Sequence, residues 1–334
     1  MNAPLTAKDF ATDQEVRWCP GCGDYAILKC VQKTMADLQA DPDQTVFVSG
    51  IGCSSRFPYY MNAYGFHTIH GRAPAFATGL KLTNPDLDVW VVTGDGDGLS
   101  IGGNHLLHVL RRNVDLQVLL FNNEIYGLTK GQYSPTSRPG TRSPSSPGGS
   151  TDAPISPALF ALGAGARFIA RGIDTDAKNL SETLKAARAY KGASFVEIFQ
   201  NCIVYNKDVF GDFTEKKSAK ETQLHAVHGE PLLFAGGAKG LRLDLKTLQL
   251  QVVTVGDEAS TEEILVHDET NATIAQLLLS LPAGGGFPMP LGVLYRAPGE
   301  TFETGFWAGQ PTAGRRTGRV ADALRRGSVW RKDA

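Results

Sequence analysis

The chain has 334 residues, of which 42% are apolar and 20% are charged, and its formal net charge is −1. A chain of this length buries about three quarters of the surface that its unfolded form exposes, so it can build a hydrophobic core without disulfides. The balanced charge gives no indication of binding to nucleic acid or to an anionic membrane, and no apolar run reaches the length of a membrane span or a secretory signal, so we expect a cytoplasmic protein.

The first predicted elements alternate between helix and strand. A helix is expected at about residues 25–38, with Asp24 as its N-terminal cap. A short β-rich run follows at 45–50, and a second helix at about 72–82 ends before a proline.

A βαβ unit is predicted next. Residues 89–93 form a continuous apolar run, which is typical of a strand buried on both faces of a parallel sheet. A glycine- and aspartate-rich turn at 94–98, a helix at about 102–112 and a second buried strand at 117–121 complete the unit.

The remaining half of the chain is less regular. A long segment rich in serine, proline, glycine and threonine is typical of a functional or disordered loop. In chain order we expect this loop at 132–158, helices at 158–170 and 179–190, a strand at 194–199, β-structure at 241–245 and 250–255, and a basic tail over about the last twenty residues.

The pattern as a whole predicts an α/β fold, a mostly parallel sheet with helices on both faces and a small C-terminal appendage. We expect three parts: an N-terminal segment with a C-x-x-C motif and a helix at 1–45, a cofactor-binding domain at 46–204, and an appendage with a tail at 205–334.

The turn Gly94-Asp95-Gly96 and the pair Asn122-Asn123 each follow a buried strand of the predicted βαβ unit. Glycines let a diphosphate approach the backbone at the carboxyl end of a sheet, where α/β proteins bind ligands. Asp95, the amide oxygen of Asn123 and the backbone carbonyl of Ile125 are the hard oxygen ligands that Mg²⁺ prefers. Either turn alone is common, but their combination in this context indicates a magnesium–diphosphate site. The glycine patterns of dinucleotide sites and of P-loops are absent.

Four of the five cysteines lie in turns or at strand ends: Cys19 and Cys22 in a C-x-x-C motif, Cys53 and Cys202. Four such thiolates can hold a [4Fe–4S] cluster or a structural Zn²⁺, and their spacing does not separate the two. Cys30 lies inside the first expected helix and is interpreted as a core residue.

Several motifs in the same order resemble the β subunit of the 2-oxoacid:ferredoxin oxidoreductases, and most closely the 2-oxoglutarate type. The matching stretches are Trp18-Cys19-Pro20-Gly21-Cys22-Gly23, Gly50-Ile51-Gly52-Cys53-Ser54-Ser55-Arg56, His70-Gly71-Arg72-Ala73, Gly94-Asp95-Gly96-Asp97-Gly98 and the run from Asn122 to Gln132. The resemblance is close over about residues 15–210 and looser beyond.

This resemblance implies a thiamine-diphosphate-binding fold and three cofactors: thiamine diphosphate, Mg²⁺ and a [4Fe–4S] cluster. The cluster would be held by Cys19, Cys22, Cys53 and Cys202, and the magnesium by Asp95, Asn123 and the carbonyl of Ile125. The implied cofactor-binding residues are Ile51, Gly52, Ser54, His70, Gly94, Asp95, Gly96, Asp97, Gly98, Asn123, Gly127 and Leu128.

The implied activity is coenzyme A-dependent oxidative decarboxylation of 2-oxoglutarate to succinyl-CoA and CO₂, with electrons passed to ferredoxin. An α subunit would supply the glutamate that activates the cofactor, for which this chain offers no clear candidate. Pyruvate or a broader range of 2-oxoacids is the alternative substrate. A non-redox thiamine-dependent decarboxylase with a zinc site, and a redox scaffold without catalysis, remain as other readings.

Three side chains are candidates for catalysis. Arg56 follows a candidate cluster ligand by three residues, and its guanidinium could fork onto the distal carboxylate of 2-oxoglutarate, although a surface or subunit contact would equally explain it. His70 could hold a diphosphate oxygen or the reacting oxygen, and Lys130 could meet the diphosphate or a substrate carboxylate.

Overall fold

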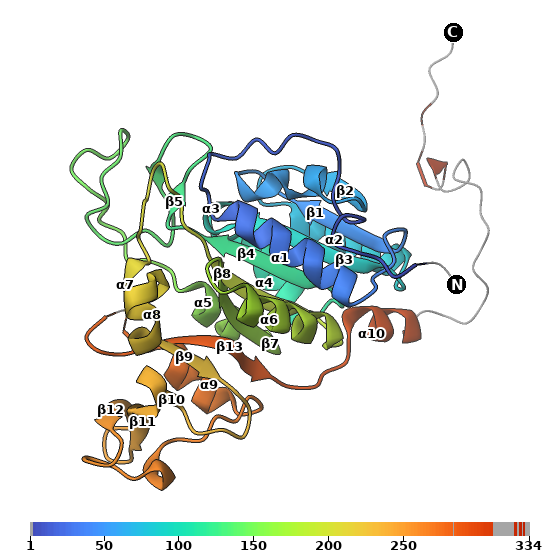
Figure 1. Ribbon diagram of the computed structural model, residues 1–334. Coiled ribbons are helices and arrows are strands. Elements are labelled where there is room, and N and C mark those ends of the chain that lie inside the picture. Colours follow the sequence, from blue (N-terminus) through green and yellow to red (C-terminus); the bar gives the residue numbers. More distant parts are fainter. Residues whose placement is uncertain (1–2, 283, 310–323, 326, 329, 331–334) are drawn as a thin grey trace.

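The computed structural model describes residues 3–282, 284–309, 324–325, 327–328 and 330. Within them an eight-stranded sheet of order β2-β1-β3-β4-β8-β7-β13-β9 forms the centre of the molecule (Figure 1). Its strands are β1 (Thr45–Ser49), β2 (Tyr64–His67), β3 (Asp88–Gly94), β4 (Gln117–Asn122), β7 (Phe168–Ile173), β8 (Ser194–Phe199), β9 (Gln223–Ala226) and β13 (Met289–Arg296).

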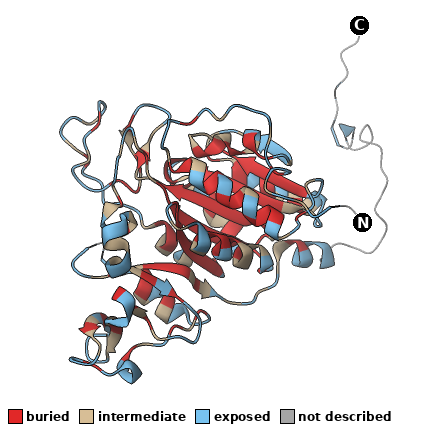
Figure 2. Ribbon diagram, viewed as in Figure 1, coloured by how far each residue is buried: buried red, intermediate tan, exposed pale blue. Residues whose placement is uncertain are grey.

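Strand directions follow the prediction of a mostly parallel sheet. The six strands from β2 to β7 are parallel, whereas β13 runs antiparallel to β7 and parallel to β9. The apolar run 89–92 of β3 is almost completely buried, as expected of a central strand covered on both faces. Figure 2 shows the same pattern across the sheet: buried strands lie between helices whose outer surfaces are exposed.

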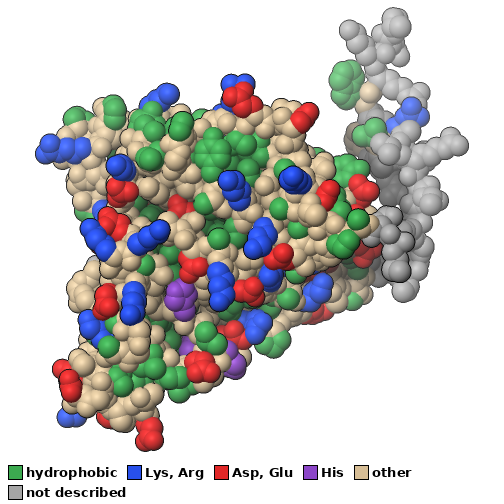
Figure 3. Space-filling view, viewed as in Figure 1, with side chains coloured by type: hydrophobic (Ala, Val, Ile, Leu, Met, Phe, Trp, Pro, Cys, Tyr) green, Lys and Arg blue, Asp and Glu red, His purple; other side chains and the backbone are tan. Residues whose placement is uncertain are grey.

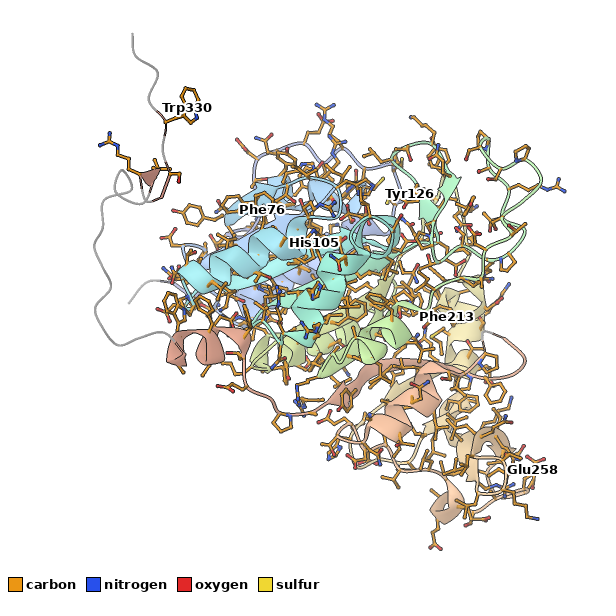
Figure 4. The ribbon with its side chains drawn as sticks, turned by 180° about the vertical axis from the view of Figure 1, so that it is seen from behind. Phe76, His105, Tyr126, Phe213, Glu258 and Trp330 are labelled. Carbon is orange, nitrogen blue, oxygen red and sulfur yellow. The ribbon has the colours of Figure 1, made fainter. Side chains whose placement is uncertain are left out.

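Helices cover both faces of the sheet, which confirms the expected α/β architecture. One face packs on α1 and α6, seen in front of the sheet in Figure 1, and the other on α2 and α4, which come to the front in Figure 4. The helices are α1 (Asp24–Asp37), α2 (Ala73–Thr83), α3 (Asp95–Leu99), α4 (Gly103–Arg111), α5 (Pro157–Gly163), α6 (Ala177–Ala189), α7 (Gly211–Thr214), α8 (Lys216–Thr222), α9 (Ala272–Leu279) and α10 (Phe302–Ala308), with 3-10 turns η1 (Ser54–Tyr60), η2 (Ala235–Gly237) and η3 (Thr261–Glu263).

The predicted βαβ unit is present. Strand β3 leads through α3 and α4 to β4, and the two strands are hydrogen-bonded neighbours in which Gly94 pairs with Phe121. Leu106, Val109 and Leu110 lie on one face of α4 and are buried against the sheet, so the crossover is held by an apolar stripe of helical spacing. The carboxyl ends of β3 and β4 therefore meet, as the candidate site requires.

The C-terminal appendage contains the expected β-structure. Strands β10 (Leu233–Phe234), β11 (Lys239–Asp244) and β12 (Gln249–Thr254) form a three-stranded antiparallel sheet beside α9, below the main sheet in Figure 1. Strands β9 and β13 flank the appendage in the sequence and yet belong to the main sheet. The division at residues 45 and 204 stays a prediction.

One expected element is wrong. The helix predicted over 158–170 ends at Gly163, and Phe168 already begins strand β7. Gly165 adopts a left-handed conformation with φ +83°, and the amides of Gly165 and Ala166 bond back to the last turn, so the chain leaves the helix there. The expected basic tail falls mostly on residues 310–323, 326, 329 and 331–334, outside the described part of the chain.

The surface carries no dominant charge of one sign on the face shown in Figure 3, where Lys and Arg alternate with Asp and Glu. In the part of the chain that the structure describes, no helix combines the length and the apolar character needed to cross a bilayer.

Candidate functional site

A cavity opens at the carboxyl ends of β3 and β4 and brings together most of the predicted cofactor residues. It is lined by Ile51, Gly52, Ser54, His70, Gly94, Asp95, Gly96, Asp97, Asn123, Ile125, Gly127 and Leu128. We call it the diphosphate cavity. Gly98 is the exception: it does not line the cavity, and a Cβ there would point at Thr93, 3.1 Å from its Cγ2.

Asp95 is buried at the first turn of α3, and its orientation is set by two hydroxyls. Ser134 Oγ donates to Asp95 Oδ2 over 2.6 Å and Thr136 Oγ1 over 2.5 Å. Thr136 also donates to Asn122 Oδ1 over 3.2 Å, so one hydroxyl ties together the ends of β3 and β4. Burial raises the pKa of Asp95 to about 6, which a bound cation would oppose by favouring the carboxylate.

Asp97 organises the loops around the cavity rather than facing it with a free carboxylate. Its Oδ1 accepts from the amides of Ile51 (3.0 Å) and Gly71 (2.7 Å) and lies 2.5 Å from His70 Nδ1, and its Oδ2 accepts from Thr93 Oγ1 (2.6 Å). A Cβ at Gly50 would lie 2.0 Å from Asp97 Oδ2, so only glycine fits there. Because Nδ1 of His70 is engaged by Asp97, its Nε2 is the nitrogen left for a ligand.

The backbone approaches closely at Gly96. The Tyr126 hydroxyl donates to the Gly96 carbonyl over 3.0 Å, and a Cβ on Gly96 would lie 2.2 Å from the Tyr126 ring. Figure 4 labels Tyr126 on β5 (Ile125–Tyr126), which pairs with β6 (Gln132–Tyr133) and carries the chain into the long loop. The turn at Asn122-Asn123, which we call the asparagine turn, is also held by a hydrogen bond: Asn123 Oδ1 accepts from the amide of Ile125 over 3.1 Å.

A second cavity of about 200 Å³ is lined by all four candidate cluster ligands, Cys19, Cys22, Cys53 and Cys202, and we call it the cysteine cavity. It shares Cys53, Asn123, Gly127 and Leu128 with the diphosphate cavity, so the two cavities adjoin. The Sγ atoms of Cys53 and Cys202 each lie 3.5 Å from the point where a Cβ on Gly127 would be. Cys30 is buried in α1 away from this group, as expected of a core residue.

Burial controls the ionisation of the thiols in this cavity. Burial raises the pKa of both the Cys22 and the Cys53 thiols, so a bound cationic centre would be needed to keep them ionised. Among the described residues, no three or more His, Cys, Asp or Glu side chains are arranged to hold a metal ion. The magnesium set is not addressed by that finding, because two of its three donors are an amide and a carbonyl.

Arg56 and Lys130 line the cysteine cavity and do not line the diphosphate cavity. Arg56 also lines a third cavity of about 470 Å³, together with Arg17, Tyr59 and His67. This substrate-sized cavity reaches the diphosphate cavity through Ile51, Gly52 and Leu128. Lys130 is exposed and does not line the diphosphate cavity, so the geometry gives no support to a contact with the diphosphate.

Asp24 differs from its expected role. It is the first residue of α1, Gly23 holds the cap position, and neither oxygen of the buried Asp24 carboxylate has a hydrogen-bond partner among the described residues. Burial raises the pKa of Asp24 to about 7, and the residue lines the diphosphate cavity. The expectation of a cap is wrong because the side chain points into the protein rather than over the first turn.

Sequence reasoning missed the buried hydroxyls of Ser134, Thr136 and Ser137, which belong to the long expected loop. Ser134 and Thr136 bond to Asp95, and Ser137 Oγ donates to the carbonyl of Glu124 over 2.5 Å. The available signal was the length of the loop, because loops of more than about 15 residues are commonly functional.

Comparisons with known proteins agree with this geometry. Residues 50–198 match the family model described as the thiamine pyrophosphate enzyme, C-terminal TPP binding domain. The 2-oxoglutarate oxidoreductase subunit KorB of Mycobacterium tuberculosis is 54% identical over 266 residues, which are 79% of this chain and 70% of the relative. Subunit beta of 2-oxoacid:ferredoxin oxidoreductase 1 of Aeropyrum pernix is 48% identical over 63% of this chain and 66% of the relative.

A solved structure is similar over almost the whole chain. It is a 2-oxoglutarate:ferredoxin oxidoreductase from Magnetococcus marinus with 2-oxoglutarate, coenzyme A and succinyl-CoA bound. The TM-score is 0.74 at 33% identity, and the match covers 97% of each chain.

Proposed function

The chain belongs to the family of 2-oxoacid:ferredoxin oxidoreductase β subunits, and we propose that it converts 2-oxoglutarate, coenzyme A and oxidised ferredoxin into succinyl-CoA, CO₂ and reduced ferredoxin, acting with an α subunit. The observation that carries this proposal is the adjoining pair of cavities, one suited to a diphosphate and its metal and the other lined by four cysteines. A cofactor at one and an electron acceptor at the other would lie side by side.

In the diphosphate cavity the residues fit Mg²⁺ and thiamine diphosphate. Asp95, the amide oxygen of Asn123 and the carbonyl of Ile125 would supply three oxygen ligands at the metal, and Gly94 and Gly96 leave the backbone open to the phosphates. Burial raises the pKa of Asp95 to about 6, and a cation bound beside it would stabilise the carboxylate.

In the cysteine cavity the residues fit a [4Fe–4S] cluster on Cys19, Cys22, Cys53 and Cys202. A lone zinc ion holds each sulfur at about 2.3 Å and so gathers its ligands tightly. A four-iron cluster takes its four thiolates at different irons and spreads them apart. The four cysteines line one cavity beside the candidate diphosphate site, and relatives named 2-oxoacid:ferredoxin oxidoreductases favour the cluster over zinc.

Bound thiamine diphosphate would supply the electron sink for decarboxylation, and the cluster would take up electrons. The chain's own residues orient the reactants. His70, held through Nδ1 by Asp97, presents Nε2 toward the diphosphate cavity. Arg56 places a cation at the wall shared by the cysteine cavity and the 470 Å³ cavity, where it would bind the distal carboxylate of 2-oxoglutarate.

The α subunit would complete the site and supply the activating glutamate. Large apolar side chains are exposed on edge strand β2, on α2 and between them: Tyr64 is 61% exposed, Ile69 68% and Phe76 48%. Phe76 stands on the outer face of α2 in Figure 4. Exposed apolar side chains favour a protein interface here, and one of them, Ile69, directly precedes His70 in the sequence.

The test is co-expression with the α subunit and an anaerobic assay of viologen reduction. Reduction should require both 2-oxoglutarate and coenzyme A, and the protein should contain iron and sulfide. Colourless protein with stoichiometric zinc would favour a non-redox decarboxylase, and a cluster without magnesium-dependent thiamine diphosphate binding would favour a redox scaffold.

Substrate choice is tested separately by Arg56→Ala. The KM for 2-oxoglutarate should rise far more than the KM for pyruvate, because only the former has a distal carboxylate to lose its partner. An equal rise for both substrates would remove Arg56 from the selection, and a wild-type preference for pyruvate would make pyruvate the substrate.

A further inference from the structure

We propose that Gln200 is a positioning residue that links the two cavities, with its amide holding the metal ligand Asn123 on one side and the cluster ligand Cys22 on the other. Gln200 Oε1 accepts from Asn123 Nδ2 over 2.8 Å, and Gln200 Nε2 donates to Cys22 Sγ over 3.2 Å. The inference rests on the proposed function, because it concerns the groups that Asn123 and Cys22 would bind.

Gln200 is held rigidly between the two sites. It follows strand β8, only 1% of its surface is exposed, and its backbone amide donates to the carbonyl of Asn122 over 2.8 Å. The residue therefore extends the ladder between β8 and β4 by one step beyond the strand ends. A buried amide in this position has no freedom to turn toward solvent.

Backbone groups set the orientation of both amides. Gln200 Nε2 also donates to the carbonyl of Asn201 over 2.7 Å, which only the nitrogen end of an amide can do. Asn123 Oδ1 accepts from the amide of Ile125, which only the oxygen end can do. These hydrogen bonds therefore run in one direction: the Ile125 amide donates to Asn123, Asn123 donates to Gln200, and Gln200 donates to Cys22.

This arrangement also determines which atom of Asn123 can bind a metal, because the hydrogen bond to Gln200 occupies the side-chain nitrogen. With Nδ2 bonded to Gln200 and Oδ1 turned toward the amide of Ile125, the remaining lone pair of Oδ1 is the part of the amide available to a cation. Partners of this kind orient metal ligands, and their loss lowers metal affinity by about 10- to 100-fold.

For the cluster, Gln200 supplies a hydrogen bond to a ligating sulfur. Such a bond stabilises the more negative, reduced state and raises the reduction potential. Asn206 adds a second tie, because its Nδ2 donates to the carbonyl of Asn123 over 2.9 Å and its amide donates to the carbonyl of Cys202 over 3.0 Å. The segment that carries Cys202 is thus fastened to the asparagine turn at two points.

Two substitutions distinguish the role of the Gln200 side-chain oxygen from that of its nitrogen. Gln200→Glu keeps an acceptor for Asn123 and removes the donor to Cys22, whereas Gln200→Met keeps a similar volume and removes both. Gln249→Glu, on the exposed surface of β12, makes the same charge change away from both cavities. All variants are prepared as the complex with the α subunit.

The readouts are the cluster's reduction potential, followed by electron paramagnetic resonance, and the affinity for Mn²⁺ used in place of Mg²⁺ with thiamine diphosphate. We expect a more negative potential in both Gln200 variants, and a loss of Mn²⁺ affinity of about 10-fold in Gln200→Met but less in Gln200→Glu. Gln249→Glu should match the wild type in both.

Potentials and Mn²⁺ affinities equal to those of the wild type in both variants would overturn the inference. If Gln200→Met assembles no cluster, Gln200→Glu carries the test of the potential alone. A wild-type complex that lacks the cluster or the Mn²⁺-dependent cofactor would instead refute the proposed function, so the two failures are distinguishable.

Discussion

The diphosphate cavity and the cysteine cavity share four residues but are built in opposite ways. Around the first, the protein supplies hydrogen bonds to the two aspartates of the 94–98 turn: two hydroxyls hold Asp95, and four donors surround Asp97. Around the second, the thiols of Cys22 and Cys53 are buried with raised pKa values, and Gln200 is the hydrogen-bond donor at Cys22. The diphosphate cavity is organised by polar contacts within the fold. In the cysteine cavity, the ionisation of the thiols depends on the group that binds there.

This difference follows from the chemistry of the ligands. Carboxylates and amides are satisfied by hydrogen bonds in a folded protein, so an oxygen site is pre-organised before the metal arrives. Thiols are weak hydrogen-bonding groups, and their ligating form is a charge that burial disfavours. We therefore expect the diphosphate cavity to keep its structure without its ligand and the cysteine cavity to gain order with its cluster.

The largest expected effect comes from Asp95→Asn. The change keeps the shape of the side chain and removes the charge that would ligate the metal, so magnesium-dependent binding of thiamine diphosphate should weaken by more than about 100-fold. Calorimetry on the complex with the α subunit measures this. Asp86→Asn, an exposed change before β3, is the control, and near-wild-type binding by Asp95→Asn would rule out the proposed metal ligand.

Cys202→Ser should abolish electron transfer and leave the diphosphate cavity intact. Iron and sulfide content and the visible absorbance should fall, while magnesium-dependent cofactor binding persists, because Asp95 and its hydroxyl partners do not depend on this thiol. Cys30→Ser is the matched control, since Cys30 lies in the core of α1 and donates only to the carbonyl of Ala177. Equal iron in Cys202→Ser and wild type would contradict the proposed cluster.

Thr136→Val tests whether the hydroxyls organise the oxygen site. Valine keeps the branched shape but removes the donor that Thr136 shares between Asp95 and Asn122, so affinity for Mg²⁺ should fall by about 10-fold. The cluster absorbance should not change. Thr151→Val, an exposed substitution in the same loop, should have no effect. A change in the cluster absorbance together with the metal affinity would contradict the expectation that the Thr136 hydroxyl acts on the oxygen site alone.

The smallest effect is expected at His267, which lies away from both cavities. Its Nε2 donates to the carbonyl of Val293 over 2.9 Å, and its buried Nδ1 has no hydrogen-bond partner among the residues that the structure describes. Burial lowers the pKa of His267 despite the opposing charges of Glu269 and Asp268. In the unfolded chain His267 therefore binds its proton at a higher pH than in the folded protein, so the contribution of this residue to stability should decrease as the pH falls through about 6.5.

Thermal unfolding at pH 7.5 and at pH 5.5 measures this dependence on the complex. His267→Gln keeps a donor for Val293 and removes the titrating group, so the midpoint of the variant relative to wild type should be higher at pH 5.5 than at pH 7.5. The same difference between variant and wild type at both pH values would assign the pH dependence to other groups.

Much of the site could be predicted because its residues lie at strand ends. Asp95 and Asn123 follow β3 and β4, and parallel neighbours end at the same edge of a sheet, so a βαβ pattern is enough to bring them together. The helix predicted over 158–170 was wrong because an alanine-rich run does not reveal where Gly165 turns left-handed. Strands β9 and β13 were missed because their partners lie in other parts of the chain.

The sequence by itself indicated the α/β class, the turn Gly94-Asp95-Gly96 at the end of a strand, the set of four cysteines and the resemblance to the family, since these depend on local periodicity and on the order of motifs. Only the tertiary structure decided that Thr136 holds Asp95, that Asp24 is buried with no hydrogen-bond partner in the described part of the chain, and that Gln200 stands between Asn123 and Cys22. The physical reason is that hydrogen bonding and burial depend on which distant segments the fold brings within about 3 Å of each other, and no local pattern records that distance.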